Sequence, residues 1–245
     1  MRKIGRVVEV WRYPVSSVSG EMPGVVDVSP AGIAGDRRFG IFDHATGRPA
    51  APEQEPRWRP ALYLSSAQSD DPLPTLSFPD SGPFSLDDPS LTERLTSYFG
   101  FAVGVATHPG PAGGPDWLFP IIPGRYAASP LHLVTTASLA ALATVAGVPS
   151  VDSRRFRPSL LIDTDEEGFV ENGWLGQTMT IGPVEIKVNE RTRRCGMTLV
   201  AQPGLNEEPH LLRSIMRHNA RSLGVYADLL GTGTIAVGDA VYANS

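Results

Sequence analysis

The chain has 245 residues, and glycine and proline together fill 48 of them. Breakers at that density argue against a mainly helical protein and favour short strands joined by turns. The net charge of −5 argues against a general nucleic-acid binder, which carries a basic surface. No apolar run approaches the about 20 residues that span a bilayer, and the start lacks a signal-peptide pattern. The sequence therefore predicts a soluble cytoplasmic protein with no membrane partner.

The first half of the chain predicts short β elements separated by glycine and proline turns. Strands are expected over 4–11, 24–28 and near 38–43. The four prolines in 49–60 predict an irregular loop. Ser90 and Glu93 fit a capping box, so we expect a helix over 91–99 that stops at Gly100, then a strand over 101–105.

Residues 108–124 hold five prolines and four glycines, which predicts a linker or a long active-site loop. Beyond it, the sequence favours an Ala/Leu helix over 136–146 and a strand over 156–163. Alternating apolar residues predict a strand pair over 179–188 around a Gly182-Pro183 turn. The last expected elements are a helix that starts near 207–209, with Gly224 just beyond its end, and strands over 225–230 and 234–237.

Cys195 is the lone cysteine, so an intrachain disulfide and a cysteine-rich metal site are both excluded. If the preceding strand continues, its period of two places Arg191, Arg193 and Cys195 on one face. Guanidinium groups near a thiol favour the thiolate, which binds soft metals or attacks electrophiles. The alternative is an inert buried cysteine between solvated arginines.

A second arginine group, Arg154, Arg155 and Arg157, lies in the same half of an acidic chain. Two such groups predict a site for an anionic ligand, with phosphate as the best candidate. A hydrolase that pairs Cys195 with His132 or His210 is a further alternative. Only two lysines are present, and no glycine-rich loop ends in Lys-Ser or Lys-Thr, which excludes a P-loop.

Four stretches of the second half share an order and spacing with a known family. They are Arg155-Phe156-Arg157-Pro158, Trp174-Leu175-Gly176, Arg193-Arg194-Cys195 with Gln202-Pro203-Gly204, and Gly224-Val225-Tyr226 with Gly233 to Asp239. Residues 120–245 thus resemble the MOSC domain of molybdenum-cofactor sulfurases and amidoxime-reducing molybdenum enzymes. Residues 1–107 resemble the β-barrel segment that precedes many MOSC domains, through Trp11 to Val15, Gly20-Glu21 and Gly35 to Phe39.

The resemblance implies a mainly β fold with a few short helices, built from a barrel-like segment over 1–107 and a MOSC β-barrel domain over 120–245. It also implies a molybdenum cofactor, whose pterin dithiolene holds the metal and carries a phosphate. Cys195 matches the cysteine that ligates molybdenum and is the expected catalytic residue. Arg37 and Arg157 match arginines near the pterin phosphate.

The remaining candidate cofactor-binding residues are Ser17, Arg155, Ser159, Arg193 and Arg194. Two positions depart from the usual family pattern: Ser16 stands where a lysine is common, and Ser159 follows Arg-Pro where asparagine is common.

By this resemblance, the chain is expected to be an oxidoreductase that removes oxygen from an N-hydroxylated small molecule. Because no flavin or iron–sulfur motif is present, electrons are expected from a separate donor protein. The first alternative is a sulfur carrier that forms a persulfide on Cys195 with a sulfur donor. The second is a MOSC-fold binding protein that has lost catalysis.

Overall fold

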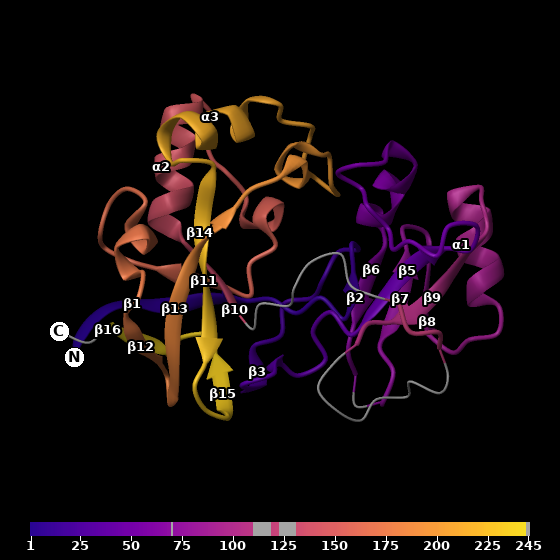
Figure 1. The fold of residues 1–245 in the computed structure, drawn as a ribbon, viewed down its shortest axis with the longest axis horizontal. Coiled ribbons are helices and arrows are strands. Elements are labelled where there is room, and N and C mark those ends of the chain that lie inside the picture. Colours follow the sequence, from indigo (N-terminus) through magenta and orange to yellow (C-terminus); the bar gives the residue numbers. More distant parts are fainter. Residues whose placement is uncertain (70, 110–118, 123–130, 244–245) are drawn as a thin grey trace.

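The computed structural model describes residues 1–69, 71–109, 119–122 and 131–243. These residues form two lobes (Figure 1). One lobe holds a closed barrel with two helices against it, and the other holds two small sheets with one helix. The predicted fold class, mainly β with a few short helices, is confirmed. None of the described helices is long and apolar enough to cross a membrane.

The barrel closes seven strands in the order β1-β11-β10-β14-β13-β12-β16. Their bounds are β1 Arg2–Val10, β10 Leu131–Thr135, β11 Leu160–Asp163, β12 Thr178–Ile181, β13 Val184–Arg193, β14 Ser222–Leu229 and β16 Ala240–Ala243. β10 and β11 run parallel, and the other neighbours are antiparallel. The barrel core is apolar and fully packed, with Val7, Leu133, Ile186, Val225 and Val241 all buried.

The alternation predicted over 179–188 is confirmed as the β12–β13 hairpin. Val184, Ile186 and Val188 are buried while Glu185 and Lys187 between them are exposed. This is the pattern of a strand with one face on a core. Gly182, at φ 53°, makes the turn, and Asp239 lies so close that a Cβ there would overlap its carboxylate.

A second sheet joins the first half of the chain to the barrel lobe. Strand β3 (Val25–Ser29) pairs with both β15 (Gly233–Ala236) and β4 (Gly32–Ile33). Together, β1 and this sheet place residues 2–10 and 25–33 on the barrel lobe, while β2 between them belongs to the second lobe. The predicted division at residue 107 therefore does not follow the hydrogen-bonded sheets, and the domain boundaries 1–107 and 120–245 stay a prediction.

Helices α2 (Thr136–Ala146) and α3 (His210–His218) pack on the outside of the barrel. Leu142 of α2 and Leu211 and Ile215 of α3 share one buried cluster. The predicted bounds of α2 are confirmed. The Thr135 hydroxyl accepts from the Ser138 N–H at 3.0 Å, and Gly147 ends the helix in the left-handed conformation.

The second lobe has its own core around Trp58, Leu91 and Leu95. Its two sheets are ordered β2-β5-β9 and β6-β7-β8. Their bounds are β2 Val15–Ser16, β5 Phe39–Asp43, β6 Ser65–Ala67, β7 Thr75–Phe78, β8 Ser81–Ser85 and β9 Val103–Thr107. Helix α1 (Leu91–Phe99) and the 3-10 turn η1 (Pro56–Tyr63) complete this core.

Several local predictions need correction. The helix over 91–99 is confirmed, but Ser90 is itself helical and makes no cap; Asp88 accepts from its N–H at 2.8 Å instead.

Part of the predicted loop 49–60 is the 3-10 turn η1. Gly224 does not follow α3 directly but lies inside β14. The predicted linker 108–124 falls largely outside the described residues.

The predicted strand over 156–163 begins later, at Leu160. Residues Ser153–Phe156 form the 3-10 turn η2 instead. The reason is local, because Arg157 takes a left-handed conformation and the following Pro158 cannot donate to a ladder. Two further 3-10 turns, η3 (Val170–Trp174) and η4 (Gly196–Leu199), precede β12 and follow β13.

A buried carboxylate ties the barrel to α2. Glu171 of η3 is fully buried and accepts from the hydroxyls of Thr135 (2.8 Å) and Ser138 and from the Gly224 N–H (2.9 Å). Burial raises the pKa of Glu171, while these three donors act in the opposite direction. The side chain thus satisfies polar groups of three separate elements.

We expect Glu171→Ala to lower the free energy of unfolding by about 3 kcal/mol, because the buried donors around it then lack an acceptor. Urea denaturation measures the change. Glu185→Ala, at an exposed position of β13, is the matched control and should shift stability by less than about 0.5 kcal/mol. Equal effects from the two variants would contradict this role of Glu171.

Candidate functional site

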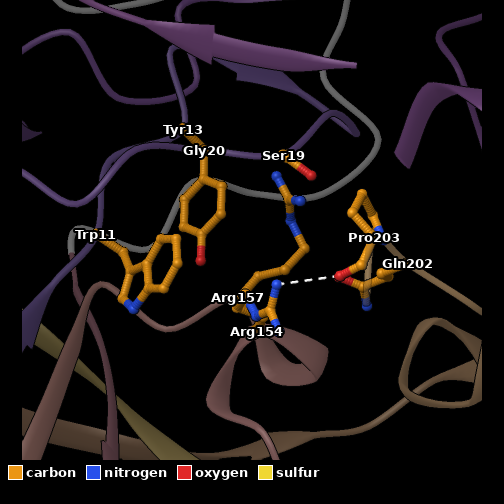
Figure 2. Close-up of a pocket in the computed structure, with 8 residues that line it drawn as sticks. All are labelled: Trp11, Tyr13, Ser19, Gly20, Arg154, Arg157, Gln202 and Pro203. Carbon is orange, nitrogen blue, oxygen red and sulfur yellow. Dashed lines mark hydrogen bonds between the residues drawn. The ribbon is translucent and has the colours of Figure 1, made fainter. Parts of the chain in front are cut away.

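A pocket lies where the chain between β1 and β2 meets the 3-10 turn η2 and the loop after η4. It is lined by Trp11, Tyr13, Ser19, Gly20, Arg154, Arg157, Gln202 and Pro203. Figure 2 shows Arg154 and Arg157 between the aromatic rings on one side and the Gln202-Pro203 turn on the other. The pocket is small, with an enclosed volume of about 20 Å³.

Tyr13 is the centre of this pocket wall. The guanidinium carbons of Arg157 and Arg37 lie 4.1 and 4.8 Å from the centroid of its ring. The ring also stacks on Trp11, with ring centroids 6.0 Å apart. Such cation–π contacts place positive charge on an aromatic face without a carboxylate. Arg37 and Arg157, two of the predicted cofactor-binding residues, thus both contact the Tyr13 ring.

The backbone around Tyr13 is fixed by a short acidic turn. The Tyr13 N–H donates to Asp36 Oδ1 at 2.7 Å, and the Tyr13 carbonyl accepts from the Arg37 N–H at 2.8 Å. The Arg37 guanidinium pairs with the Asp36 carboxylate. Burial opposes the charge of Arg37, but Asp36 outweighs it and raises the pKa of the guanidinium.

Three predicted site residues have strained backbone conformations. Ser17, Arg37 and Arg157 have φ values of 67°, 51° and 53°. Side chains other than glycine rarely adopt this left-handed region, and strain of this kind gathers at functional sites. The segments also touch, since Arg157 Nη1 donates to the Val18 carbonyl at 2.7 Å and Arg37 Nη2 donates to the Arg157 carbonyl at 3.3 Å.

Buried positive charge distinguishes this site. Arg155 and Arg194 are 7% and 8% exposed, and Arg157 is half-buried. Within the described residues, no carboxylate forms an ion pair with any of the three. Burial lowers the pKa of Arg157 to about 10, so it stays charged at neutral pH. Buried cations without anions are costly, and a bound anion would offset that cost.

A buried histidine links Arg157 to Arg194. His132 Nδ1 lies 3.3 Å from the Arg157 carbonyl, and its Nε2 lies 3.4 Å from Arg194 Nη1. Burial and then the Arg194 charge hold the pKa of His132 well below its usual value. The ring is therefore neutral, with Nδ1–H as donor and Nε2 as acceptor. Because both nitrogens are engaged, His132 cannot serve as the base of a Cys195 hydrolase.

Cys195 begins the 3-10 turn η4 and is half-buried against Leu62, Met197 and Val200. Arg191 and Arg193 share the exposed side of β13, as the period of two predicts, with buried Thr192 between them. The strand does not continue to Cys195, because β13 ends at Arg193.

Both of these arginines are exposed, whereas Arg194 is the buried one. Arg194 Nη2 donates to the Phe156 carbonyl at 2.8 Å. Arg194 is therefore the arginine next to Cys195 that belongs to the buried cationic group, and Arg193 lies on the surface.

Arg155 and Ser159 bind protein backbone. Arg155 donates to the carbonyls of Thr198 (3.3 Å) and Asn206 (2.7 Å), and so braces the loop that follows Cys195. Ser159 is buried, and its hydroxyl accepts from the His132 N–H at 3.1 Å.

The hydroxyl of Ser17 donates to the Ala50 carbonyl at 3.0 Å. Arg37 and Arg157 thus meet on the Tyr13 ring, and Arg194 is linked to Arg157 through His132. Ser17 does not line the pocket.

Sequence reasoning missed Tyr13 and Gln202 as site residues, and it considered His132 only as the base of a hydrolase. Tyr13 and Gln202 lie inside the stretches that carry the family resemblance, and that was the available signal. The sequence does not show that these two side chains are buried, whereas in the structure Tyr13 is 2% exposed and Gln202 is 7% exposed. Tyr13 Oη, Gln202 Nε2 and Arg194 Nε lack a hydrogen-bond partner among the described residues.

We expect Arg155→Ala to lower the free energy of unfolding by about 2–3 kcal/mol, because two backbone carbonyls lose a charged donor. Arg154→Ala should cost less than about 1 kcal/mol, since its pair with Asp152 is solvent-exposed. Alkylation of native Cys195 should also become faster in Arg155→Ala, whose loop is no longer braced. Unchanged stability and labelling in Arg155→Ala would contradict the bracing role.

Comparisons with solved structures support the fold. The YuaD protein from Bacillus subtilis is 10% identical, and the match covers 100% of this chain and 99% of that chain with a TM-score of 0.52. YiiM from Geobacillus stearothermophilus is 16% identical over 48% of this chain and 55% of its own, with a TM-score of 0.38. The first likeness is one of fold alone, and the second is too distant to carry an argument. No curated protein matches the sequence.

The family is shown by sequence. The MOSC domain pattern matches residues 107–242, which is more than half of the chain. The matched range contains strands β10 to β15 and most of β16, the Arg155–Pro158 segment and Cys195. The chain therefore belongs to the MOSC domain family.

Proposed function

We propose that this protein binds a molybdenum cofactor and reduces an N-hydroxylated small molecule. The observation that carries the proposal is a set of buried arginines, next to the loop of Cys195, that have no carboxylate partner in the part of the chain that the structure describes. Arg157 and Arg194 join through His132. Arg155 holds the same loop that Cys195 begins.

The donor chemistry fits such a cofactor. Guanidinium groups with spare N–H donors and two orphaned neutral donors suit a phosphate. A thiolate is a soft ligand suited to molybdenum. In the described residues no three His, Cys, Asp or Glu side chains gather. Cys195 would thus be the protein's own ligand, and the rest of the coordination would come from the cofactor.

Ser16 is the main departure from the family pattern. It is half-buried in β2, where the family often has a lysine. A missing cation weakens a phosphate contact by about 1–3 kcal/mol. The arginines on Tyr13 supply positive charge from other elements, so we propose that Arg37 and Arg157 carry the phosphate contact here.

The proposed reaction is a two-electron reduction. The N–O bond of the substrate breaks, and two protons and two electrons yield the N–H product and water. The bound cofactor supplies the oxygen-transfer chemistry. The protein's residues hold it: Arg37 and Arg157 bind its anionic end, and Cys195 fixes the metal. Electrons come from a separate donor protein.

We expect molybdenum near one atom per chain in protein made under cofactor-sufficient conditions, and a loss of most of it in Cys195→Ala. The reason is that the metal loses its protein ligand. Elemental analysis of the purified protein measures both. Lys187→Ala, exposed on β13, is the control and should keep its molybdenum. Wild-type protein without metal, and with no gain on reconstitution, would overturn the proposal.

Sulfur transfer is the second candidate, supported by the partial exposure of Cys195, which a sulfur donor can reach. Here the Cys195 thiolate would take the outer sulfur of a donor persulfide, the donor would leave as a thiol, and Cys195 would carry the persulfide. Intact-mass measurement after exposure to a sulfur donor should then show one added sulfur, absent in Cys195→Ala. A Cys195 that stays unmodified would argue against transfer.

A further inference from the structure

Exposed arginines gather around the C-terminal end of α3. They are Arg193 at the end of β13, Arg213 and Arg217 of α3, and Arg221 just beyond that helix. All four residues are exposed. Among the residues that the structure describes, no carboxylate forms an ion pair with any of them. These four arginines form the basic surface.

The fold brings the members of the basic surface to one corner of the barrel lobe. Arg213 and Arg217 are four residues apart, so they lie on the same side of α3. Arg193 pairs across the β13–β14 ladder with Ser222, the residue that follows Arg221. The N–H of Arg221 donates to a carbonyl of the last turn of α3 at 3.2 Å, which holds it against the helix.

Along the chain, no carboxylate interrupts this surface. Residues 209–222 contain three arginines and two histidines but no Asp or Glu. The carboxylates that precede α3 are Glu207 and Glu208, at the other end of the helix, and Glu207 pairs with Arg59 at 3.9 Å. In a chain of net charge −5, this corner therefore carries a local excess of positive charge.

The basic surface is attached to the segment of Cys195. Arg221 Nε donates to the Arg194 carbonyl at 3.0 Å, and the Arg194 N–H donates to the Arg221 carbonyl at 2.9 Å. That Arg194 carbonyl belongs to the peptide bond with Cys195. Ala220 and Arg221 both adopt the left-handed conformation, at φ 47° and 64°, and such strain persists only where the surroundings fix it.

The composition of the surface favours a folded protein as its partner. Met216, one turn from Arg213, is 55% exposed. Arginine and methionine are both enriched in protein–protein interfaces. A long polyanion such as a nucleic acid or an anionic membrane would also meet the acidic remainder of the chain, which repels it. A small acidic protein can contact the basic corner alone.

We propose that the basic surface is the docking site of a small acidic electron-carrier protein. The inference rests on the proposed function, which requires electrons from a separate donor. A carrier must dock close to the centre that it reduces, because electron transfer slows steeply with distance, and this surface is bonded to the residue before Cys195. Complementary charge brings such a partner to the surface and sets its orientation.

The test measures binding of an acidic [2Fe–2S] ferredoxin to the purified chain by calorimetry. We expect binding at low salt that weakens at least about tenfold near 0.2 M salt, because exposed charges are screened beyond about 10 Å at 0.1 M. The double variant Arg213→Gln/Arg217→Gln should bind about tenfold more weakly than wild type at low salt. Cytochrome c, a basic electron carrier, should not bind.

A matched control removes the same charge elsewhere. Arg2 and Arg6 are exposed on β1, where they pair with Glu166 and Asp163. Arg2→Gln/Arg6→Gln should leave ferredoxin affinity unchanged. Both double variants should melt at the wild-type temperature, since substitutions at exposed positions have little effect on stability.

Three results would overturn the inference. They are a wild-type chain that binds no ferredoxin at low salt, an Arg213→Gln/Arg217→Gln variant with wild-type affinity, and tighter binding of an oligothymidine or of phosphatidylserine vesicles than of ferredoxin. The last result would mean a general polyanion site.

The proposed function fails separately, on metal content. A chain that takes up no molybdenum but binds ferredoxin through Arg213 and Arg217 would keep the docking site and reject the cofactor. A chain that holds molybdenum and binds no ferredoxin would do the reverse.

Discussion

The site depends on one constraint: guanidinium groups are buried with no carboxylate paired to them among the residues that the structure describes. Arg155 and Arg194 lie inside the protein, and Arg157 is half-buried on an aromatic ring. The protein offsets the cost of this burial with backbone carbonyls and π faces, which are neutral acceptors. Net positive charge is thus left over within a chain of net charge −5. That excess is the physical basis of the proposal that the site binds an anion.

The supporting structure follows from this constraint. A neutral His132 between Arg157 and Arg194 adds no further charge and aligns the two segments that carry them. Backbone strain at Arg37 and Arg157 aims both side chains at Tyr13. Such strain persists only where the surroundings fix it, and here the barrel strands and the Asp36 turn do so.

The sequence predicted what depends on local patterns. The β12–β13 hairpin follows from strict alternation, and α2 follows from a run of Ala and Leu that ends at Gly147. The family motifs pointed to Cys195, Arg37 and Arg157. That β13 ends at Arg193, before Cys195, could not be read, because an alternating pattern does not say where a strand ends. The roles of Tyr13 and Gln202 could not be predicted either, because their burial depends on segments that are distant in the sequence.

The place of β1 in the barrel has a consequence for how the chain folds. Residues 2–6 pair with residues 240–243, and residues 6–10 pair with residues 160–163. The barrel therefore closes only after nearly the whole chain has been synthesised, and its seam joins the most distant parts of the sequence. Contacts of such long sequence separation slow folding. Strand β1 can complete its pairing only after β16 has been synthesised, and its apolar face stays exposed until then.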